Sequence, residues 1–212
     1  MKKINEILKH NFKDESLLKT ALTHSSKTAD TGEANYERLE YLGDAILGVV
    51  VAKYLYDNFD IDAGNLSKYR AKLVNAKVLA SVVRELGIDE YICVGKSVKN
   101  LSENICADVY ESLLAAIYLD GGDYVQYVQN TLLKSKQHVL DILDSETDYK
   151  TELQEKLFKK HNTFEYKLIS KHGEGVDSMF EVALIIDGVE KSRASAKSIR
   201  LAEQTCAKMI LK

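Results

Sequence analysis

The chain has 212 residues, 45% of them hydrophobic and 29% charged, a composition that suits one large or two small folded domains and excludes a disordered chain. Its longest apolar run, residues 45–52, is far shorter than the ~20 residues that cross a bilayer, and residue 1 is not followed by an apolar signal core, so we expect a cytoplasmic protein with no membrane partner. A formal net charge of −3 excludes a uniformly basic surface, so any binding of nucleic acid must rely on local patches of Lys and Arg.

The first two thirds of the chain show helical periodicity and predict an all-α domain over residues 1–144. Apolar residues recur at intervals of three and four almost throughout, and we see no convincing strand. The predicted helices cover residues 4–12, 15–26, 35–56, 65–87, 104–122 and 124–143. Gly87 and the pair Gly121 and Gly122 are expected helix ends.

One of these helices carries an acidic stripe in the sequence NYERLEYLGDAIL, residues 35–47. At ~100° per residue, Glu37, Glu40 and Asp44 fall within about 60° of one another around the helix axis. A solvated polar face is the usual explanation of such spacing. However, Arg38 is the only cation in the stretch, so the like charges would repel one another. A bound cation would relieve that repulsion.

A second acidic pair, Asp108 and Glu111, stands three residues apart in ADVYESLLAAIYLDGG, on one face of another predicted helix. If the two helices meet, their carboxylates form the oxygen-rich site that Mg²⁺ or Mn²⁺ prefers, with substrate phosphate completing the ligands. Such a site favours phosphoryl transfer or phosphodiester hydrolysis. Spacing alone does not show that the helices meet, and solvated helix faces remain the alternative.

The pattern changes after a polar linker at residues 145–147. Residues 148–212 predict a small α+β domain, in the order helix, three strands, helix, with an antiparallel sheet. The strands cover residues 164–170, 178–187 and 189–196, between helices at 149–161 and 197–212. Asp187 and Gly188 form the expected hairpin turn. Residues 1–147 hold 17 basic and 22 acidic side chains, against 12 and 10 in residues 148–212, which also suggests two parts.

The residues quoted above resemble the signature of the ribonuclease III family of the bacterial type. The likeness continues through ALTHSS, GNLSKYRAKLVN and ADVYESLLAAIYLDGG, and residues from DYKTELQEKL onward resemble the family's double-stranded-RNA-binding domain. The resemblance implies a Mg²⁺-dependent endoribonuclease that hydrolyses a phosphodiester in each strand of double-stranded RNA. It implies 5′-phosphate and 3′-hydroxyl ends with a short 3′ overhang, and a role in processing ribosomal and other RNA precursors.

The resemblance also implies roles for individual residues. Glu40, Asp108 and Glu111 would bind the metal, Glu111 having the most direct part in catalysis, and Asp44 would orient the attacking water. Glu37 would support the site from the substrate side. The family acts as a homodimer with one cleavage centre in each helical domain. Tyr41 stands where the family usually has a Phe that packs into the partner subunit, although the residues alone favour an ordinary core aromatic there.

In the second domain the resemblance implies two groups of RNA contacts. Duplex RNA is recognised by its shape, through 2′-hydroxyls and phosphates over ~16 base pairs. The implied contacts are Thr151, Gln154 and Glu155 on the first helix, and Lys197, Ser198 and Arg200 at the last helix. Three positions depart from the family pattern, namely Ile199 in place of a Lys, Glu174 in place of a Pro and Val176 in place of a His. We therefore expect weaker RNA binding and a shallower salt dependence than in fully basic relatives.

Two other functions compete with this hypothesis. The chain could be a catalytically silent protein that binds duplex RNA or the ribosome, although the presence of Glu40, Asp44, Asp108 and Glu111 argues against silence. Without the resemblance, it could be a helical metal-dependent phosphohydrolase that acts on nucleotides. The sheet-bearing second domain and its basic last helix favour a polymeric substrate instead.

Overall fold

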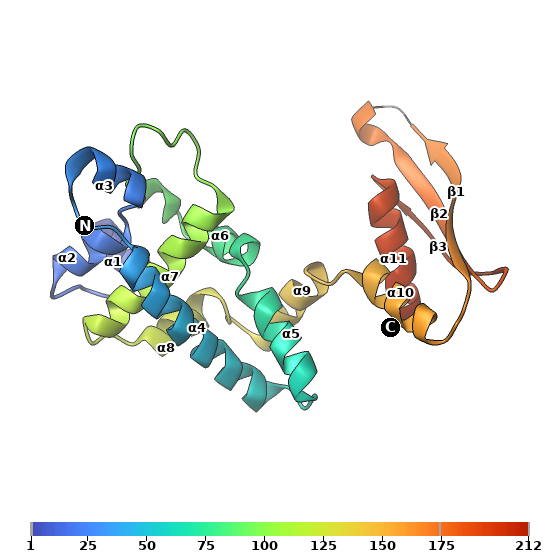
Figure 1. Cartoon of the computed structure of the whole chain (residues 1–212), viewed down its shortest axis with the longest axis horizontal. Coiled ribbons are helices and arrows are strands. Elements are labelled where there is room, and N and C mark those ends of the chain that lie inside the picture. The colour runs from blue at the N-terminus through green and yellow to red at the C-terminus, as the bar shows by residue number, and fades with distance from the viewer. Residues whose placement is uncertain (1, 174, 212) are drawn as a thin grey trace. The chain divides into compact units, whose positions relative to one another are not determined.

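The computed structural model describes residues 2–173 and 175–211. They form two compact units that divide between Glu146 and Thr147. The first unit is helical and the second combines two helices with a three-stranded antiparallel sheet (Figure 1). This confirms the predicted fold class. None of the described helices is long and apolar enough to cross a membrane.

The first unit is built around helix α7 (Glu103–Leu119), whose residues 112–117 are all buried. The longest helix, α4 (Glu37–Asn58), packs against α7, as do α2 and α6. The other elements are α1 (Lys2–Leu8), α2 (Glu15–Ala21), α3 (Ser25–Thr31), α5 (Ala63–Leu73), α6 (Ala76–Glu85), the 3₁₀ turn η1 (Asp89–Tyr91), α8 (Tyr124–Thr131) and α9 (Lys136–Ser145). A single apolar core contains residues of α1, α2 and each of the helices α4 to α9.

Three of the predicted helices are each two helices in the structure. The helix predicted at 15–26 breaks at Leu22 to His24, because the N–H of Cys93 donates to the Leu22 carbonyl (2.8 Å) and the N–H of His24 donates to the Cys93 carbonyl (2.9 Å). The helix predicted at 65–87 restarts at Asn75, whose side chain accepts from the Val78 N–H (2.9 Å). In the third predicted helix, at 124–143, Ser135 begins α9 in the same way, because its hydroxyl accepts a hydrogen bond from the His138 N–H. Apolar periodicity runs through such caps unchanged and therefore does not reveal them.

The second unit places α10 (Tyr149–Lys159) and α11 (Ile199–Leu211) against each other, with α11 packed on strands β2 (Met179–Ile186) and β3 (Val189–Ala196). Strand β1 (Phe164–His172) completes the sheet, in the order β1-β2-β3. Asp187 and Gly188 both have positive φ, 50° and 77°, as a tight two-residue hairpin requires. Glu174 lies outside the described residues, and Val176 falls in the 3₁₀ turn η2 (Gly175–Asp177).

Candidate active site

The backbones of helices α4 and α7 are in close contact at Gly43. A Cβ atom added to Gly43 would lie 1.9 Å from the carbonyl oxygen of Glu111 and 2.4 Å from its carbonyl carbon. Real side chains do not tolerate such distances, so glycine is what permits the two backbones to meet here. The contact brings the acidic stripe of α4 beside the acidic pair of α7.

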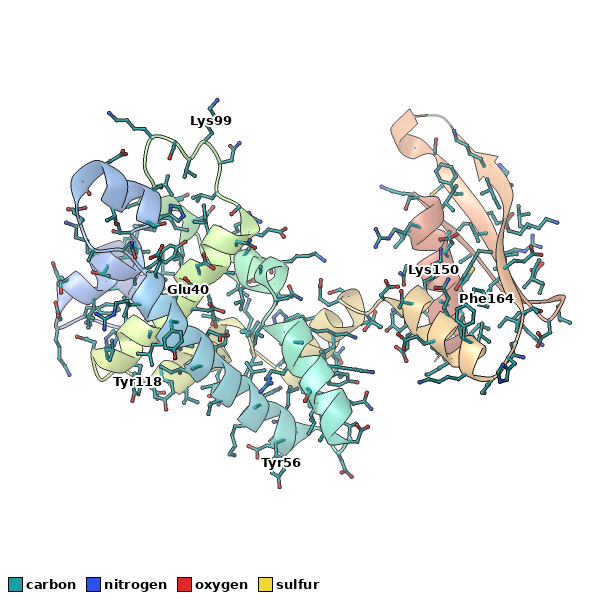
Figure 2. The ribbon with its side chains drawn as sticks, in the orientation of Figure 1. Glu40, Tyr56, Lys99, Tyr118, Lys150 and Phe164 are labelled. Atoms are coloured by element: carbon teal, nitrogen blue, oxygen red, sulfur yellow. The ribbon has the colours of Figure 1, made fainter. Side chains whose placement is uncertain are left out.

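The result is a cluster of three carboxylates, Glu40, Asp108 and Glu111, which we call the acidic cluster. Each offers one oxygen, and these oxygens all lie within 4.8 Å of one another. All three residues are partly buried. Glu40 lies on the stretch of α4 that crosses α7 (Figure 2). Glu37 and Asp44, one turn before and one turn after Glu40, are both exposed.

The acidic cluster carries unbalanced negative charge. Burial, followed by the charges of Asp44, Asp108 and Glu40, raises the pKa of Glu111 to about 8. Burial and neighbouring carboxylates also raise the pKa of Glu40. In the part of the chain that the structure describes, none of the ion pairs involves a residue of the cluster. Unpaired, partly buried carboxylates that repel one another gain stability from a bound cation.

The donor set fits a hard divalent cation. All the available ligand atoms are carboxylate oxygens, which suit Mg²⁺, Mn²⁺ or Ca²⁺ and not the softer metals that prefer thiolate or imidazole. If each of the three carboxylates binds through one oxygen, the remaining positions of a six-coordinate ion are left to water and substrate oxygens. The structure therefore provides a candidate metal site.

Tyr36 is a member of the site that the sequence patterns did not single out. Its hydroxyl donates to Asp108 Oδ2 at 3.0 Å, and the residue is only 2% exposed. A buried tyrosine usually finds a partner for its hydroxyl. In the sequence, the one sign that Tyr36 belongs to the site is its position directly before the acidic stripe. Its hydrogen-bond partner lies 72 residues away along the chain, so the sequence does not show the bond.

Tyr41 is 83% exposed, so the core position that the residues alone favour is wrong for this side chain. It belongs to a set of large apolar residues that α4, α7 and α8 present to solvent. We call this set the apolar face: Tyr41, Val49, Tyr56, Tyr118, Leu119 and Val125. A cavity of about 500 Å³ between α4 and α8 adjoins it, lined by Val49, Tyr54, Val125 and Leu133 among others.

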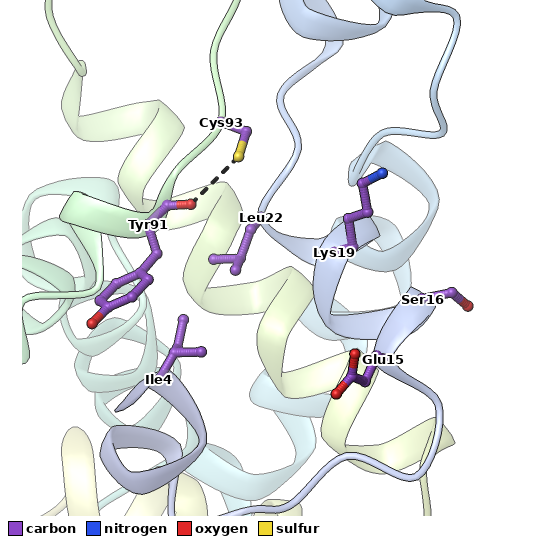
Figure 3. A pocket seen from close by; sticks show the side chains of 7 residues that line it. All are labelled: Ile4, Glu15, Ser16, Lys19, Leu22, Tyr91 and Cys93. Atoms are coloured by element: carbon purple, nitrogen blue, oxygen red, sulfur yellow. Dashed lines mark hydrogen bonds between the residues drawn. The ribbon is translucent and has the colours of Figure 1, made fainter. Parts of the chain in front are cut away.

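A second cavity of about 500 Å³ lies on another part of the first unit (Figure 3). Ile4, Leu22 and Tyr91 give it apolar walls, and Lys19 of α2 lies at its edge. The Lys19 ammonium already pairs with Glu33 at 2.6 Å. The residues that line this cavity include no member of the acidic cluster.

The two groups of predicted RNA contacts occupy neighbouring helices of the second unit. Thr151, Gln154 and Glu155 lie on α10, Arg200 lies in α11, and Lys197 and Ser198 directly precede α11. Asp148 joins the groups, since it accepts from Gln204 Nε2 (2.5 Å) and from the Thr151 hydroxyl (3.0 Å). These bonds, with the charge of Arg200, lower the pKa of Asp148.

Two of these predicted contacts already have partners within the unit. The Thr151 hydroxyl donates to Asp148, and the Ser198 hydroxyl accepts from the Leu201 N–H at 3.2 Å. Ser198 thus caps α11. Lys197, Arg200 and Glu155 are exposed, and Gln154 is half-buried. Ile199, which departs from the family pattern, is 41% exposed at the start of α11.

Comparison with known proteins matches both units. Residues 14–136 match the family model described as Ribonuclease-III-like, and residues 149–212 match the double-stranded RNA binding motif. Among curated relatives, Ribonuclease 3 of Campylobacter fetus subsp. fetus is 36% identical, covering 100% of this chain and 96% of the relative. Ribonuclease 3 of Bartonella bacilliformis is 38% identical, covering 99% and 91%.

Solved structures agree with these relatives. The nuclease domain of ribonuclease III from Campylobacter jejuni is 33% identical, with a TM-score of 0.54, and the match covers 68% of this chain and 96% of that domain. That domain is described as flexible in a region involved in dimer formation. With a family model over more than half of its residues and relatives matched along nearly their whole length, this chain belongs to the ribonuclease III family of double-strand-specific endoribonucleases.

Proposed function

We propose that this endoribonuclease depends on Mg²⁺, with Mn²⁺ able to replace it, and hydrolyses one phosphodiester in each strand of double-stranded RNA. The products would carry 5′-phosphate and 3′-hydroxyl ends. The observation that carries the proposal is the acidic cluster, whose three carboxylates converge from two helices within 4.8 Å. Ribosomal and other RNA precursors in the cytoplasm are the substrates that this activity suggests.

Each residue of the site has a proposed role that follows from its position. Glu40, Asp108 and Glu111 would hold the ion. When bound, the ion supplies Lewis-acid stabilisation of the charge that develops on the phosphate oxygens. Asp44 is exposed one turn beyond Glu40, so its carboxylate can accept a hydrogen bond from the attacking water and orient it. Glu37, exposed one turn earlier, would support the site from the substrate side.

We also propose that the protein works as a homodimer through the apolar face. Tyr41, Val49 and Tyr56 are 83%, 70% and 76% exposed on α4, which is costly for side chains of this size unless a partner covers them. A twofold dimer buries the same face of both subunits. Paired cleavage centres can then cut opposite strands of one duplex.

In this proposal, residues 148–212 bind the duplex and residues 1–144 cut it, with 145–147 as the linker. Gln154 and Glu155 of α10, with Thr151, would contact 2′-hydroxyls in the minor groove, since amide, carboxylate and hydroxyl groups can bond to them. Lys197, Ser198 and Arg200 would contact phosphates at the start of α11, where the helix dipole adds its own attraction.

One cleavage assay tests the proposal. The full-length protein is incubated with long duplex RNA, single-stranded RNA, duplex DNA or a nucleotide, each with Mg²⁺ or with EDTA. We expect cleavage of duplex RNA alone, only with Mg²⁺, and 5′ ends that a ligase can join. Duplex RNA that stays intact in Mg²⁺ but is bound would support the silent RNA-binding alternative, and hydrolysis of the nucleotide would support the phosphohydrolase.

Two variants make the assay specific for the acidic cluster. Glu111→Gln removes one charge and conserves shape, so it should abolish cleavage while the protein still folds. Glu103→Gln makes the same change on the same helix, at an exposed position outside the cluster, and should cut like the parent. Equal activity of the two variants would contradict the assignment of the site.

A further inference from the structure

The hydrogen bond between Tyr36 and Asp108 links the acidic cluster to the protein interior. The Tyr36 hydroxyl donates to Asp108 Oδ2 at 3.0 Å from a position that is 2% exposed. A tyrosine hydroxyl keeps its proton at neutral pH. In this pair it is therefore the donor and the Asp108 carboxylate is the acceptor.

Tyr36 is held both at its backbone and at its ring. Its main-chain N–H donates to the carbonyl of Thr23 at 3.0 Å. The ring of His24 packs edge-on against it, with centroids 5.6 Å apart and an interplanar angle of 63°. His24 is in turn fixed by a 2.7 Å hydrogen bond to the Ser26 hydroxyl and by its backbone bond to Cys93. The donor thus reaches Asp108 from a rigid support.

Within the acidic cluster, Asp108 is the residue whose carboxylate is held by a hydrogen bond from Tyr36. In the described part of the chain, the side chains of Glu40 and Glu111 have no recorded hydrogen bond, whereas Asp108 has the one from Tyr36. A carboxylate has two oxygens, so Tyr36 can hold Oδ2 while the other oxygen stays available to a cation. A metal ligand that is already fixed before the ion binds loses less conformational entropy on binding, so the ion binds more tightly.

We propose that Tyr36 is a positioning residue for the acidic cluster, whose hydroxyl fixes the orientation of Asp108 so that a divalent cation meets a preformed ligand. The inference rests on the metal site of the proposed function. Partners that orient metal ligands in this way typically contribute about 10- to 100-fold to metal affinity or activity.

Direct binding of Mn²⁺ to the full-length protein tests this role, with free Mn²⁺ measured by electron paramagnetic resonance. Tyr36→Phe keeps the ring and removes only the hydroxyl, and it should raise the dissociation constant at least about tenfold. Tyr110→Phe is the matched control, because Tyr110 is also fully buried and its hydroxyl bonds to Thr131 at 2.8 Å, away from the cluster. It should bind Mn²⁺ within about twofold of the parent. Parent-like binding by Tyr36→Phe, or an equal loss in Tyr110→Phe, overturns the proposal.

The cleavage reaction gives a second readout. A positioning role predicts that Tyr36→Phe needs more Mg²⁺ for half-maximal activity, while kcat at saturating Mg²⁺ returns close to that of the parent. If Tyr36→Phe unfolds in EDTA while Tyr110→Phe does not, the hydroxyl serves the fold and the proposal fails.

Asp108→Asn separates this inference from the proposed function. If Asp108→Asn binds Mn²⁺ like the parent, the proposed metal site is wrong. If Asp108→Asn loses Mn²⁺ while Tyr36→Phe retains it, the metal site stands and only the role of Tyr36 is overturned.

Discussion

Gly43 and Glu111 are in backbone contact, so close that a methyl group on residue 43 would lie 1.9 Å from the Glu111 carbonyl oxygen. This one approach places a carboxylate of α7 beside the carboxylates of α4. A substitution at Gly43 can therefore disturb the site, although it adds no charge and removes no metal ligand.

Gly43→Ala should therefore destabilise the first unit and weaken metal binding together. Overpacking typically costs about 1–3 kcal/mol. Relief of the clash requires α4 and α7 to move apart, which separates Glu111 from Glu40. Urea unfolding followed by circular dichroism measures the loss. Gly48→Ala is the control on the same helix, since a Cβ there would meet no described atom within 4 Å beyond its neighbouring residues and the nearby helix backbone. It should keep or raise stability, as Ala usually does within a helix. Equal stability of the two variants would contradict the close approach.

Glu111→Gln should be more stable than the parent in EDTA at about pH 9, above the raised pKa of Glu111, since it then removes one of three mutually repelling carboxylates. We expect a rise in Tm of at least about 2 °C, the shift that roughly 1 kcal/mol gives in a chain of this size. Adding Mg²⁺ should reverse the order, because an ion that binds only the folded parent stabilises it by about 2.7 kcal/mol at 100 times the Kd. Glu103→Gln should respond to Mg²⁺ like the parent. A lower Tm of Glu111→Gln in EDTA would show that repulsion does not dominate at the site.

Tyr41→Lys should convert the proposed dimer into a monomer. A lysine in the apolar face would be buried without a partner in the dimer, at a cost of several kcal/mol, whereas in the monomer it reaches water. Light scattering after size-exclusion chromatography measures the mass. Phe158→Lys makes the same kind of change at a side chain that is 67% exposed in the second unit and should leave the mass unchanged. A dimeric Tyr41→Lys would place the interface elsewhere.

Ile199→Lys should strengthen binding of duplex RNA and steepen its salt dependence. Ile199 is exposed between Ser198 and Arg200, so a lysine there can add one phosphate contact, and each contact changes the slope of log K against log salt by about 0.9. Binding is measured in EDTA with the Glu111→Gln protein, which should not cut. Met209→Lys, 57% exposed near the end of α11, controls for added charge. An unchanged slope would show that Ile199 is not a cause of the weaker binding that the sequence predicts.

The sequence predicts those parts of the fold that depend on neighbouring residues. Apolar periodicity predicts the helical first unit, and Asp187 with Gly188 predicts the hairpin turn, because both features are local. Residue spacing also predicts that Asp108 and Glu111 share a helix face. Whether they meet Glu40 depends on how α4 packs against α7. That packing includes the contact between Gly43 and Glu111, which are far apart in the sequence.

Tyr36 was missed for a related reason. Its function lies in one hydrogen bond to a residue on another helix, and no periodicity encodes such a bond. The break at Leu22 to His24 is similar, because backbone pairing with Cys93 overrides a continuous helical pattern. Local patterns thus give the types of residue in the site, and tertiary packing decides which of them meet.

The contact between Gly43 and Glu111 uses main-chain atoms on the α7 side. A substitution of the side chain at position 111 therefore leaves this contact, and with it the separation of the helices, unchanged. Repacking the interior between α4 and α7 with larger side chains would change the size of the ion that the site admits, in favour of a larger ion such as Ca²⁺, which accepts longer bonds than Mg²⁺. The proposed metal site would thus change its selectivity through substitutions in the hydrophobic core, with every carboxylate left in place.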